Sequence, residues 1–198
     1  MRLEHAFEVP ASPRQTLELL LDAERVVPCM PGARLVEVVD DRTWKAEMAV
    51  KLGPVGMNFA VDVRMQERDD DAGTVTLGVS GREARGKGGA EGTVHSTLTP
   101  ADGGGTRVVM DTDLRFSGQA AQLGRPGVVK DVSNKLVGQF AECIRARLSA
   151  GDDQEAAAEA VERAGKPISG LSLMLSALLS AIRRAFGRNR GRGREEAT

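Results

Sequence analysis

The sequence segment that comes nearest to a chemical motif is the glycine-rich run from Gly81 to Gly88, whose spacing follows that of a phosphate-binding loop as far as its lysine. Such a loop needs a serine or threonine after the lysine to hold magnesium, and a helix whose first amides face the phosphates. Gly88 stands in place of that hydroxyl, and Gly89 to Leu98 has the composition of a strand. The run therefore predicts a glycine-rich hairpin between two strands and not a nucleotide site.

The histidines and cysteines form no recognisable catalytic or metal-binding pattern. His5 and His95 lie outside any catalytic motif, and His95 falls on the opposite strand phase from Val94, which predicts an exposed side chain. Cys29 and Cys143 lie far apart without Cys-x-x-Cys spacing, so we expect two packing cysteines in a reducing cytoplasm, with a reactive thiol at Cys29 as the alternative. The sequence thus predicts no catalytic residue, no metal site and no covalent cofactor.

Composition narrows the classes of partner. The 198-residue chain has a formal net charge of −1, only 3% aromatic residues, no tyrosine and a single tryptophan. Single-stranded nucleic acid binds to proteins by stacking on aromatic side chains, so nucleic acid is a poor candidate partner. The N-terminus, Met1 to His5, has no apolar signal-peptide run, and we therefore expect a cytoplasmic protein.

The strongest functional signal lies near the C-terminus, in residues 167–187. Apolar residues form a broad helical face there, serines occupy the narrow polar side, and arginines follow directly. A helix of this kind buries its apolar face in the headgroup region of a membrane while its basic residues attract anionic lipid, here the inner leaflet of the cytoplasmic membrane. The residues expected to bind the membrane are Leu171, Met174, Leu175, Leu178, Ile182, Arg183, Arg184, Phe186, Arg188 and Arg190.

Two other interpretations of this segment compete with the first. The uncharged stretch from Ile168 to Ile182 would span only ~22 Å as a helix, whereas the hydrocarbon core of a bilayer is ~30 Å thick. A spanning helix would also carry six arginines across the membrane, against the positive-inside tendency. We therefore prefer a helix that lies in the membrane surface. The remaining alternative is that the apolar face docks on the protein's own domain or in a partner's groove.

The residues before this segment predict strands followed by one long helix. Residues 3–9 predict a strand, and Ser12-Pro13 predicts the start of a helix that must end by Pro28. From Leu35 to Phe116 apolar residues recur at every second position between turns, which predicts at least five antiparallel strands in a meander. A helical stripe then follows, and Pro126 predicts its start or a kink. The stripe consists of Val128, Val132, Leu136, Phe140, Ile144 and Leu148.

These patterns divide the chain into four successive parts. We expect a folded domain over residues 1–149, an acidic, alanine-rich linker over 150–166, the amphipathic helix over 167–187 and an arginine-rich tail over 188–198. The segment from Arg183 to Thr198 has six arginines and two glutamates, a charge of +4, so the rest of the chain carries −5. A basic end is thus attached to an acidic domain.

Three motifs are similar to those of a known family: the turn Cys29-Met30-Pro31-Gly32-Ala33 after a short helix, the glycine-rich segment 81–92, and Gly105-Thr106-Arg107. Over about residues 1–148 the chain resembles the CoxG family of carbon monoxide dehydrogenase subunits, which belongs to the START-like (SRPBCC) superfamily. The resemblance implies an α+β helix-grip fold, in which a curved antiparallel sheet wraps around a long C-terminal helix. It also implies a non-catalytic accessory protein of a molybdenum carbon monoxide dehydrogenase, which helps that enzyme meet the membrane and its quinone pool.

The inward faces of the expected strands are rich in methionine, whose flexible side chains suit a long apolar ligand such as an isoprenoid or a quinone, for example menaquinone. The opposing interpretation is that the same residues simply pack against the long helix. The expected residues of the apolar cavity are Trp44, Met48, Val50, Met57, Phe59, Val61, Met65, Leu77, Met110, Phe116, Val132, Leu136 and Phe140.

Three functions follow from these patterns. The first is a carrier of an apolar ligand that meets both the membrane and the dehydrogenase, and the second is a recruitment module without a cavity. The third is an enzyme of the cyclase or hydratase type, which the superfamily also contains. The polar candidates for inward positions, Ser96, Thr112 and Asn58, form no recognisable catalytic constellation. We therefore expect the carrier.

Overall fold

The structure of the protein is a computed structural model, which describes residues 1–52, 55–86, 88–123 and 126–150. Within these ranges seven antiparallel strands form one sheet in the order β1-β7-β6-β5-β4-β3-β2. The predicted meander is therefore confirmed for β2 to β7, and the first strand of the chain adds to the edge of the last. The strands are β1 (Arg2–Val9), β2 (Ala33–Asp40), β3 (Thr43–Leu52), β4 (Val55–Asp69), β5 (Thr74–Glu83), β6 (Gly88–Pro100) and β7 (Thr106–Ser117).

The first helical region consists of three short pieces. Ser12 caps α1 (Pro13–Leu21) through a capping box with Gln15. The helix ends at Asp22, because the Asp22 side chain accepts a hydrogen bond from the Arg25 amide and so caps a new helix, α2 (Ala23–Val26). The 3-10 turn η1 (Val27–Cys29) contains Pro28 and completes the unit. The single helix expected before Pro28 is therefore divided by the cap at Asp22.

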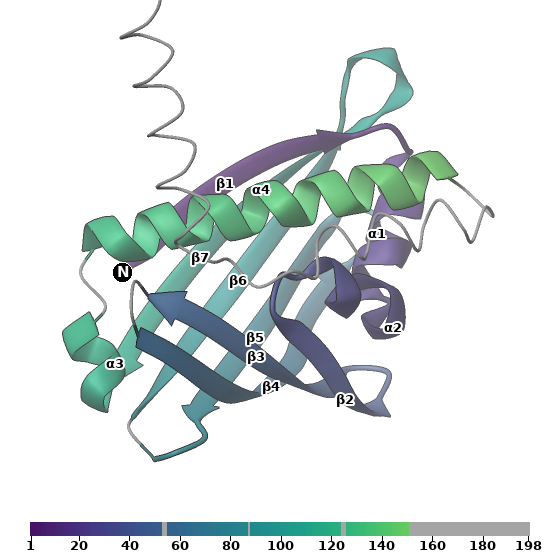
Figure 1. Ribbon diagram of the computed structural model, residues 1–198. Coiled ribbons are helices and arrows are strands. Elements are labelled where there is room, and N and C mark those ends of the chain that lie inside the picture. The colour runs from purple at the N-terminus through teal and green to yellow at the C-terminus, as the bar shows by residue number, and fades with distance from the viewer. Residues whose placement is uncertain (53–54, 87, 124–125, 151–198) are drawn as a thin grey trace, which may run out of the picture. The chain divides into compact units, whose positions relative to one another are not determined.

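The long helix α4 (Pro126–Ala150) starts at Pro126, after a short helix α3 (Gly118–Leu123) that was not expected. Figure 1 shows α4 lying beside β1 across the open side of the curved sheet. Arg145 Nε donates to the Glu8 carbonyl oxygen over 2.6 Å near one end of β1, which fixes the C-terminal half of α4 there. A second 3-10 turn, η2 (Asp102–Gly104), joins β6 to β7.

The predicted stripe of α4 is correct in its C-terminal half and wrong at its start. Phe140 and Ile144 are buried, but Val128 is 39% exposed. Steps of four residues drift around a helix that turns every 3.6 residues, so the neighbouring Val129 takes the buried place at this end.

The packed core lies where α1, η1 and the C-terminal half of α4 cover the sheet. Phe7 on β1 and Phe140 on α4 meet edge to face, with their ring centroids 6.1 Å apart. A smaller cluster, Ala23, Val27, Trp44 and Ala46, packs beside it. The main cluster contains Phe7, Val9, Leu17, Leu19, Cys29, Met65, Val75, Leu98, Val108, Phe140, Ala141, Cys143 and Ile144.

Cys29 and Cys143 form a disulfide that joins η1 to α4. Their Cα atoms are 5.4 Å apart, within the usual range for such a bridge. Both cysteines pack in the core as expected, but the expectation of separate thiols is wrong, because the fold brings together residues separated by 114 positions. Both residues are buried, so neither is a reactive surface thiol. The cysteines also no longer support the expected reducing compartment.

Candidate ligand-binding site

The two ends of the sheet differ in the turns and helices that lie there. Because the strands form an antiparallel meander, the turns β2–β3, β4–β5 and β6–β7 lie at one end, together with α1, and we call this the α1 end. The β3–β4 and β5–β6 hairpins lie at the other, together with α3 and the start of α4, and we call it the α3 end (Figure 1). The packed core belongs to the α1 end.

Towards the α3 end most inward-facing apolar side chains are only half-buried, although Met57 is buried. Strand register places two of the half-buried side chains side by side, because Phe59 pairs with Met48. These side chains face the same side as the core, yet they keep accessible surface. We call this set the apolar wall. It consists of Met48, Val50, Phe59, Val61, Val79, Leu114 and Phe116, whereas Val63 packs against the cluster that contains Trp44.

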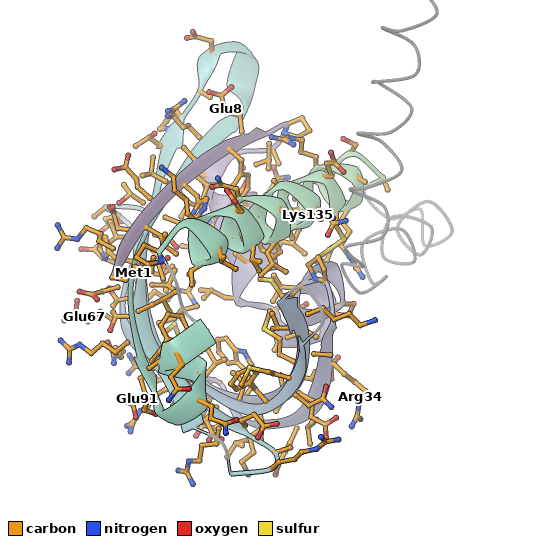
Figure 2. The ribbon with its side chains drawn as sticks, turned by 60° about the vertical axis from the view of Figure 1, so that its left-hand side comes forward. Met1, Glu8, Arg34, Glu67, Glu91 and Lys135 are labelled. Atoms are coloured by element: carbon orange, nitrogen blue, oxygen red, sulfur yellow. A yellow bond between two sulfur atoms is a disulfide. The ribbon has the colours of Figure 1, made fainter. Side chains whose placement is uncertain are left out.

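The burial of side chains also differs between the two halves of helix α4. Phe140, Cys143 and Ile144, in the half that covers the α1 end, are buried. Val132 and Leu136, in the other half, are half-buried. The sheet is curled so that the labelled Glu67 and Glu91 point away from the side that α4 covers (Figure 2). The concave side is therefore filled at the α1 end, and apolar surface remains accessible towards the α3 end.

The structure divides the predicted cavity residues into two groups. Trp44, Met65 and Phe140 are buried members of the packed clusters. Met57 is also buried, although it lies at the α3 end. Leu77 and Met110 are partly buried and pack against the core. The remaining predicted residues are half-buried and surround the accessible part of the concave side, namely Met48, Val50, Phe59, Val61, Phe116, Val132 and Leu136.

The inward face also carries polar side chains. Ser96 is buried and pairs with Met110, and Thr112 is half-buried on the same face. Asn58 is exposed and pairs with the exposed Ala49, so its expected inward position is wrong. Odd-numbered residues of β4 face inward, which places Asn58 on the outer face.

His5 is an inward polar residue that sequence reasoning left aside. It lies between the buried Leu3 and Phe7 on β1, and the alternation of that strand was enough to place it inward. Its Nε2 lies 3.1 Å from Asn134 Oδ1 and 3.1 Å from Ser133 Oγ, so it connects β1 to α4. Nδ1 is buried and has no hydrogen-bond partner within the described residues. His95 faces outward as predicted, and its Nδ1 lies 3.0 Å from Thr76 Oγ1.

Glu83 was also missed, because the glycine-rich run around it predicted only a hairpin. It ends β5 on the inward face, opposite Phe59, and is only 7% exposed. The Arg85 amide donates to its Oε2 over 2.8 Å. Figure 1 shows this hairpin at the α3 end, so a carboxylate borders the apolar wall. The phosphate-loop interpretation stays rejected, since the segment after Gly88 is strand β6.

A hollow of about 520 Å³ lies elsewhere, at the β2–β3 turn. It is lined mainly by polar residues, including Asp40, Arg42, Arg64 and Gln66. The Arg42 amide donates to Asp40 Oδ1 over 2.8 Å, and this hydrogen bond holds the pKa of Asp40 below its ordinary value. The hollow is polar and lies at the α1 end, so it is not the predicted apolar site. In the described ranges no three His, Cys, Asp or Glu side chains gather as metal ligands.

The predicted linker, amphipathic helix and arginine-rich tail, with all ten predicted membrane-binding residues, lie outside the described residues. Among the helices that the structure describes, none is long and apolar enough to cross a membrane.

Comparison with known proteins agrees with this architecture. Residues 6–149 match the CoxG family, which is named for a subunit of carbon monoxide dehydrogenase. No curated protein matches the sequence. A conserved protein from Geobacillus kaustophilus has a similar structure, with a TM-score of 0.67 and 17% identity over 75% of this chain and 95% of that one. A Mycobacterium smegmatis protein has a TM-score of 0.55 and 19% identity over 75% and 91% of the two chains. These similarities confirm the START-like helix-grip fold.

Proposed function

The chain belongs to the CoxG family of carbon monoxide dehydrogenase subunits, and from that premise we propose that it carries a quinone or a similar isoprenoid ligand between the membrane and a carbon monoxide dehydrogenase. The accessory role follows from the family. The ligand, the membrane attachment and the transfer are our proposal. The observation that carries it is the apolar wall, whose residues face the interior of the fold and still keep accessible surface.

The wall suits a long apolar ligand more than a small polar one. Aliphatic and aromatic side chains supply most of its surface, and apolar surface removed from water stabilises a complex by ~25 cal/mol per Å². Met48 is half-buried in this wall, and methionine side chains adapt to irregular shapes. Oxidation of carbon monoxide releases two electrons, and a quinone is a two-electron acceptor that partitions into the membrane. A carrier would therefore join the two reactions.

Membrane attachment is assigned to residues 167–187 and the arginines behind them. The support is their sequence pattern, an apolar helical face followed by six arginines. In this proposal the attachment is peripheral, at the cytoplasmic face of the cytoplasmic membrane.

The ligand proposal is tested by placing a bulky side chain in the apolar wall. Val61 faces inward and is half-buried, whereas its neighbour Ala60 is exposed on the outer face. We expect Val61→Trp to abolish retention of menaquinone by the purified protein, measured by extraction and mass spectrometry, because the indole occupies the accessible space. Ala60→Trp is the matched control and should retain the quinone. Equal retention by both variants, or no retention by the unmodified protein, would overturn the proposed carrier.

The attachment is tested by sedimentation with vesicles that contain anionic phosphatidylglycerol. We expect deletion of residues 167–198 to abolish sedimentation of the protein at physiological salt, since the apolar face and the arginines are lost together. A second variant keeps the length and charge but replaces Leu171, Leu175 and Leu178 with serine. Unchanged sedimentation of both variants would refute this anchor.

A further inference from the structure

The two ends of the sheet carry opposite charges. The turns at the α1 end expose six aspartates, accompanied by Arg42, Arg68 and Arg107; Arg107 is paired with Glu8, so these residues together carry a charge of −4. Arg68 is moreover paired with Asp70. The six aspartates are Asp40, Asp41, Asp69, Asp70, Asp71 and Asp102.

The hairpins at the α3 end are basic. Lys51, next to the β3–β4 turn, and Arg82 and Arg85, at the β5–β6 turn, are exposed. None of these three cations has an ion-pair partner within the described part of the chain. Two carboxylates lie on the same hairpins: Glu83 is buried and faces inward, and Glu91 is exposed further along β6. Three exposed cations thus accompany one exposed carboxylate among the described residues of these hairpins, a net charge of +2 presented to solvent. We call Lys51, Arg82 and Arg85 the basic rim.

The basic rim lies at the end where the apolar wall is accessible. Arg82 and Arg85 flank the inward Glu83, and Lys51 follows the wall residue Val50 along β3. At the same end the start of α4 exposes Val128, Lys130 and Asp131, so this helix start adds no net charge. Cations, one exposed apolar residue and access to the interior thus meet at one end of the fold, opposite the disulfide and the packed core.

We infer that the α3 end is a docking surface for an anionic membrane, which points the apolar wall towards the lipid. This inference rests on the proposed carrier function, and it adds a contact of the folded domain to the contact of residues 167–187. A basic residue close to an anionic leaflet contributes roughly 1 kcal/mol of attraction. The rim therefore orients a domain that the C-terminal segment holds near the membrane, although it is too weak to hold it alone.

The charges of the two ends indicate both the partner, an anionic membrane, and the end of the domain that faces it. The folded domain, residues 1–150, has 19 basic and 21 acidic residues, a net charge of −2, so as a whole it is weakly repelled by an anionic surface. The two ends are separated by strands of 10 to 15 residues, or roughly 30 to 50 Å. That distance exceeds the Debye length of about 8 Å at physiological salt, so each end interacts independently with its surroundings. Only the α3 end approaches an anionic bilayer favourably.

The orientation is measured by hydrogen exchange with mass spectrometry on the full chain, with and without vesicles of phosphatidylglycerol and phosphatidylcholine. We expect slower exchange in peptides that cover residues 82–86 and 126–130 when anionic vesicles are added. Peptides that cover residues 69–73 and 101–105, at the α1 end, should not change. Protection of the α1 end, no protection of the α3 end, or the same protection with pure phosphatidylcholine vesicles would overturn the inference.

A charge-reversal pair tests the rim itself. Arg82→Glu with Arg85→Glu should weaken binding of the full chain to anionic vesicles by roughly 30-fold or more, given about one kcal/mol for each basic residue lost. Arg14→Glu with Arg64→Glu makes the same change of net charge at exposed positions away from the rim, and it should weaken binding far less. Equal losses in the two variants would overturn the inference, as would a loss in the rim variant of binding to an acidic protein partner but not to vesicles.

The same variants separate this inference from the carrier proposal. Retention of menaquinone in solution depends on the apolar wall and should be unchanged in the Arg82→Glu, Arg85→Glu protein. Transfer of the quinone to anionic vesicles should be slower in that protein. Loss of retention would count against the docking role of the rim, whereas normal retention with normal transfer would overturn the docking surface and leave the carrier proposal intact.

Discussion

At the scale of single residues, the motifs that identified the family have structural reasons. Gly32 has a φ of 78°, and a Cβ there would collide with the Ala49 carbonyl oxygen. Thr106 is fully buried, and its hydroxyl donates to the Ala11 carbonyl oxygen over 2.6 Å. A Cβ on Gly105 would lie 2.6 Å from the Val9 carbonyl oxygen, so the chain passes too closely there for a side chain. The Gly105-Thr106 motif thus holds the α1 end together, whereas the Gly32 turn packs against β3 beside the wall residues Met48 and Val50.

The disulfide gives the first prediction at this scale. It joins residues separated by 114 positions, and a cross-link over so long a loop restricts the unfolded chain strongly. We expect dithiothreitol to lower the free energy of unfolding, measured by urea titration, by about 2 to 5 kcal/mol. The double variant Cys29→Ala, Cys143→Ala should be insensitive to dithiothreitol. Two free thiols in the unreduced, denatured protein would contradict the bond.

Asp70 gives a prediction about pH. Its hydrogen bond with the Arg68 guanidinium lowers the pKa of the carboxyl below the ordinary value of 3.8. A lowered folded pKa means that the carboxylate contributes stability above the unfolded value and loses it as the pH falls through the folded value. We expect Asp70→Asn to be slightly less stable than the unmodified protein at pH 7, and the difference to shrink as the pH falls below 3.8 and through the lowered folded pKa. Asp71→Asn, at a neighbouring exposed position without a resolved ion pair, is the control, and thermal denaturation across the pH range is the measurement. A difference that persists at low pH would contradict this role.

At the scale of elements, the two halves of α4 have different roles. Its C-terminal half belongs to the core through Phe140, Ala141, Cys143 and Ile144. Its N-terminal half presents half-buried residues to the accessible part of the concave side.

At the far edge of the sheet, β2 carries two register irregularities and exposes Val36, Val38 and Val39. Bulges of this kind distort an edge strand and disfavour pairing with another chain.

Shortening a side chain to alanine should have different effects in the two halves of α4. We expect Phe140→Ala to lower the free energy of unfolding by about 3 to 5 kcal/mol, because it removes a buried ring and leaves a cavity. Leu136→Ala should cost less than about 2 kcal/mol, since the side chain is only half-buried, but it should weaken quinone retention. Urea titration measures the first quantity and ligand extraction the second. Equal destabilisation would show that the wall is packed as tightly as the core.

At the scale of the whole domain, the charge and the burial of the inward face both change from the α1 end to the α3 end. The α1 end is closed by helices, cross-linked by the disulfide and acidic, and the α3 end is basic with accessible apolar surface. A hydrophobic site and an electrostatic contact should therefore respond differently to salt.

We expect binding of the full chain to anionic vesicles to weaken several-fold when the ionic strength rises from about 0.05 M to about 0.3 M, because screening shortens the reach of the basic rim and of the C-terminal arginines. Retention of menaquinone in solution should stay constant or rise slightly over the same range, because apolar burial is not screened. Parallel co-sedimentation and extraction measure both. A parallel fall of the two quantities would contradict a ligand site that is independent of charge.

The sequence by itself determined the fold class, the strand phases and the family. Alternation with period two depends only on neighbouring residues, which is why the apolar inward positions of β3, β4 and β5 were predicted correctly. The same argument could have placed Asn58 on the outer face and His5 on the inner one. It could not predict the disulfide, because bonding of Cys29 to Cys143 depends on how α4 crosses the sheet. It also could not tell which inward residues pack and which stay accessible, since Met65 and Val61 follow the same pattern on one strand. Only the tertiary structure decided that difference, because the helices cover one end of the sheet more fully than the other, and accessible surface depends on what lies opposite a side chain.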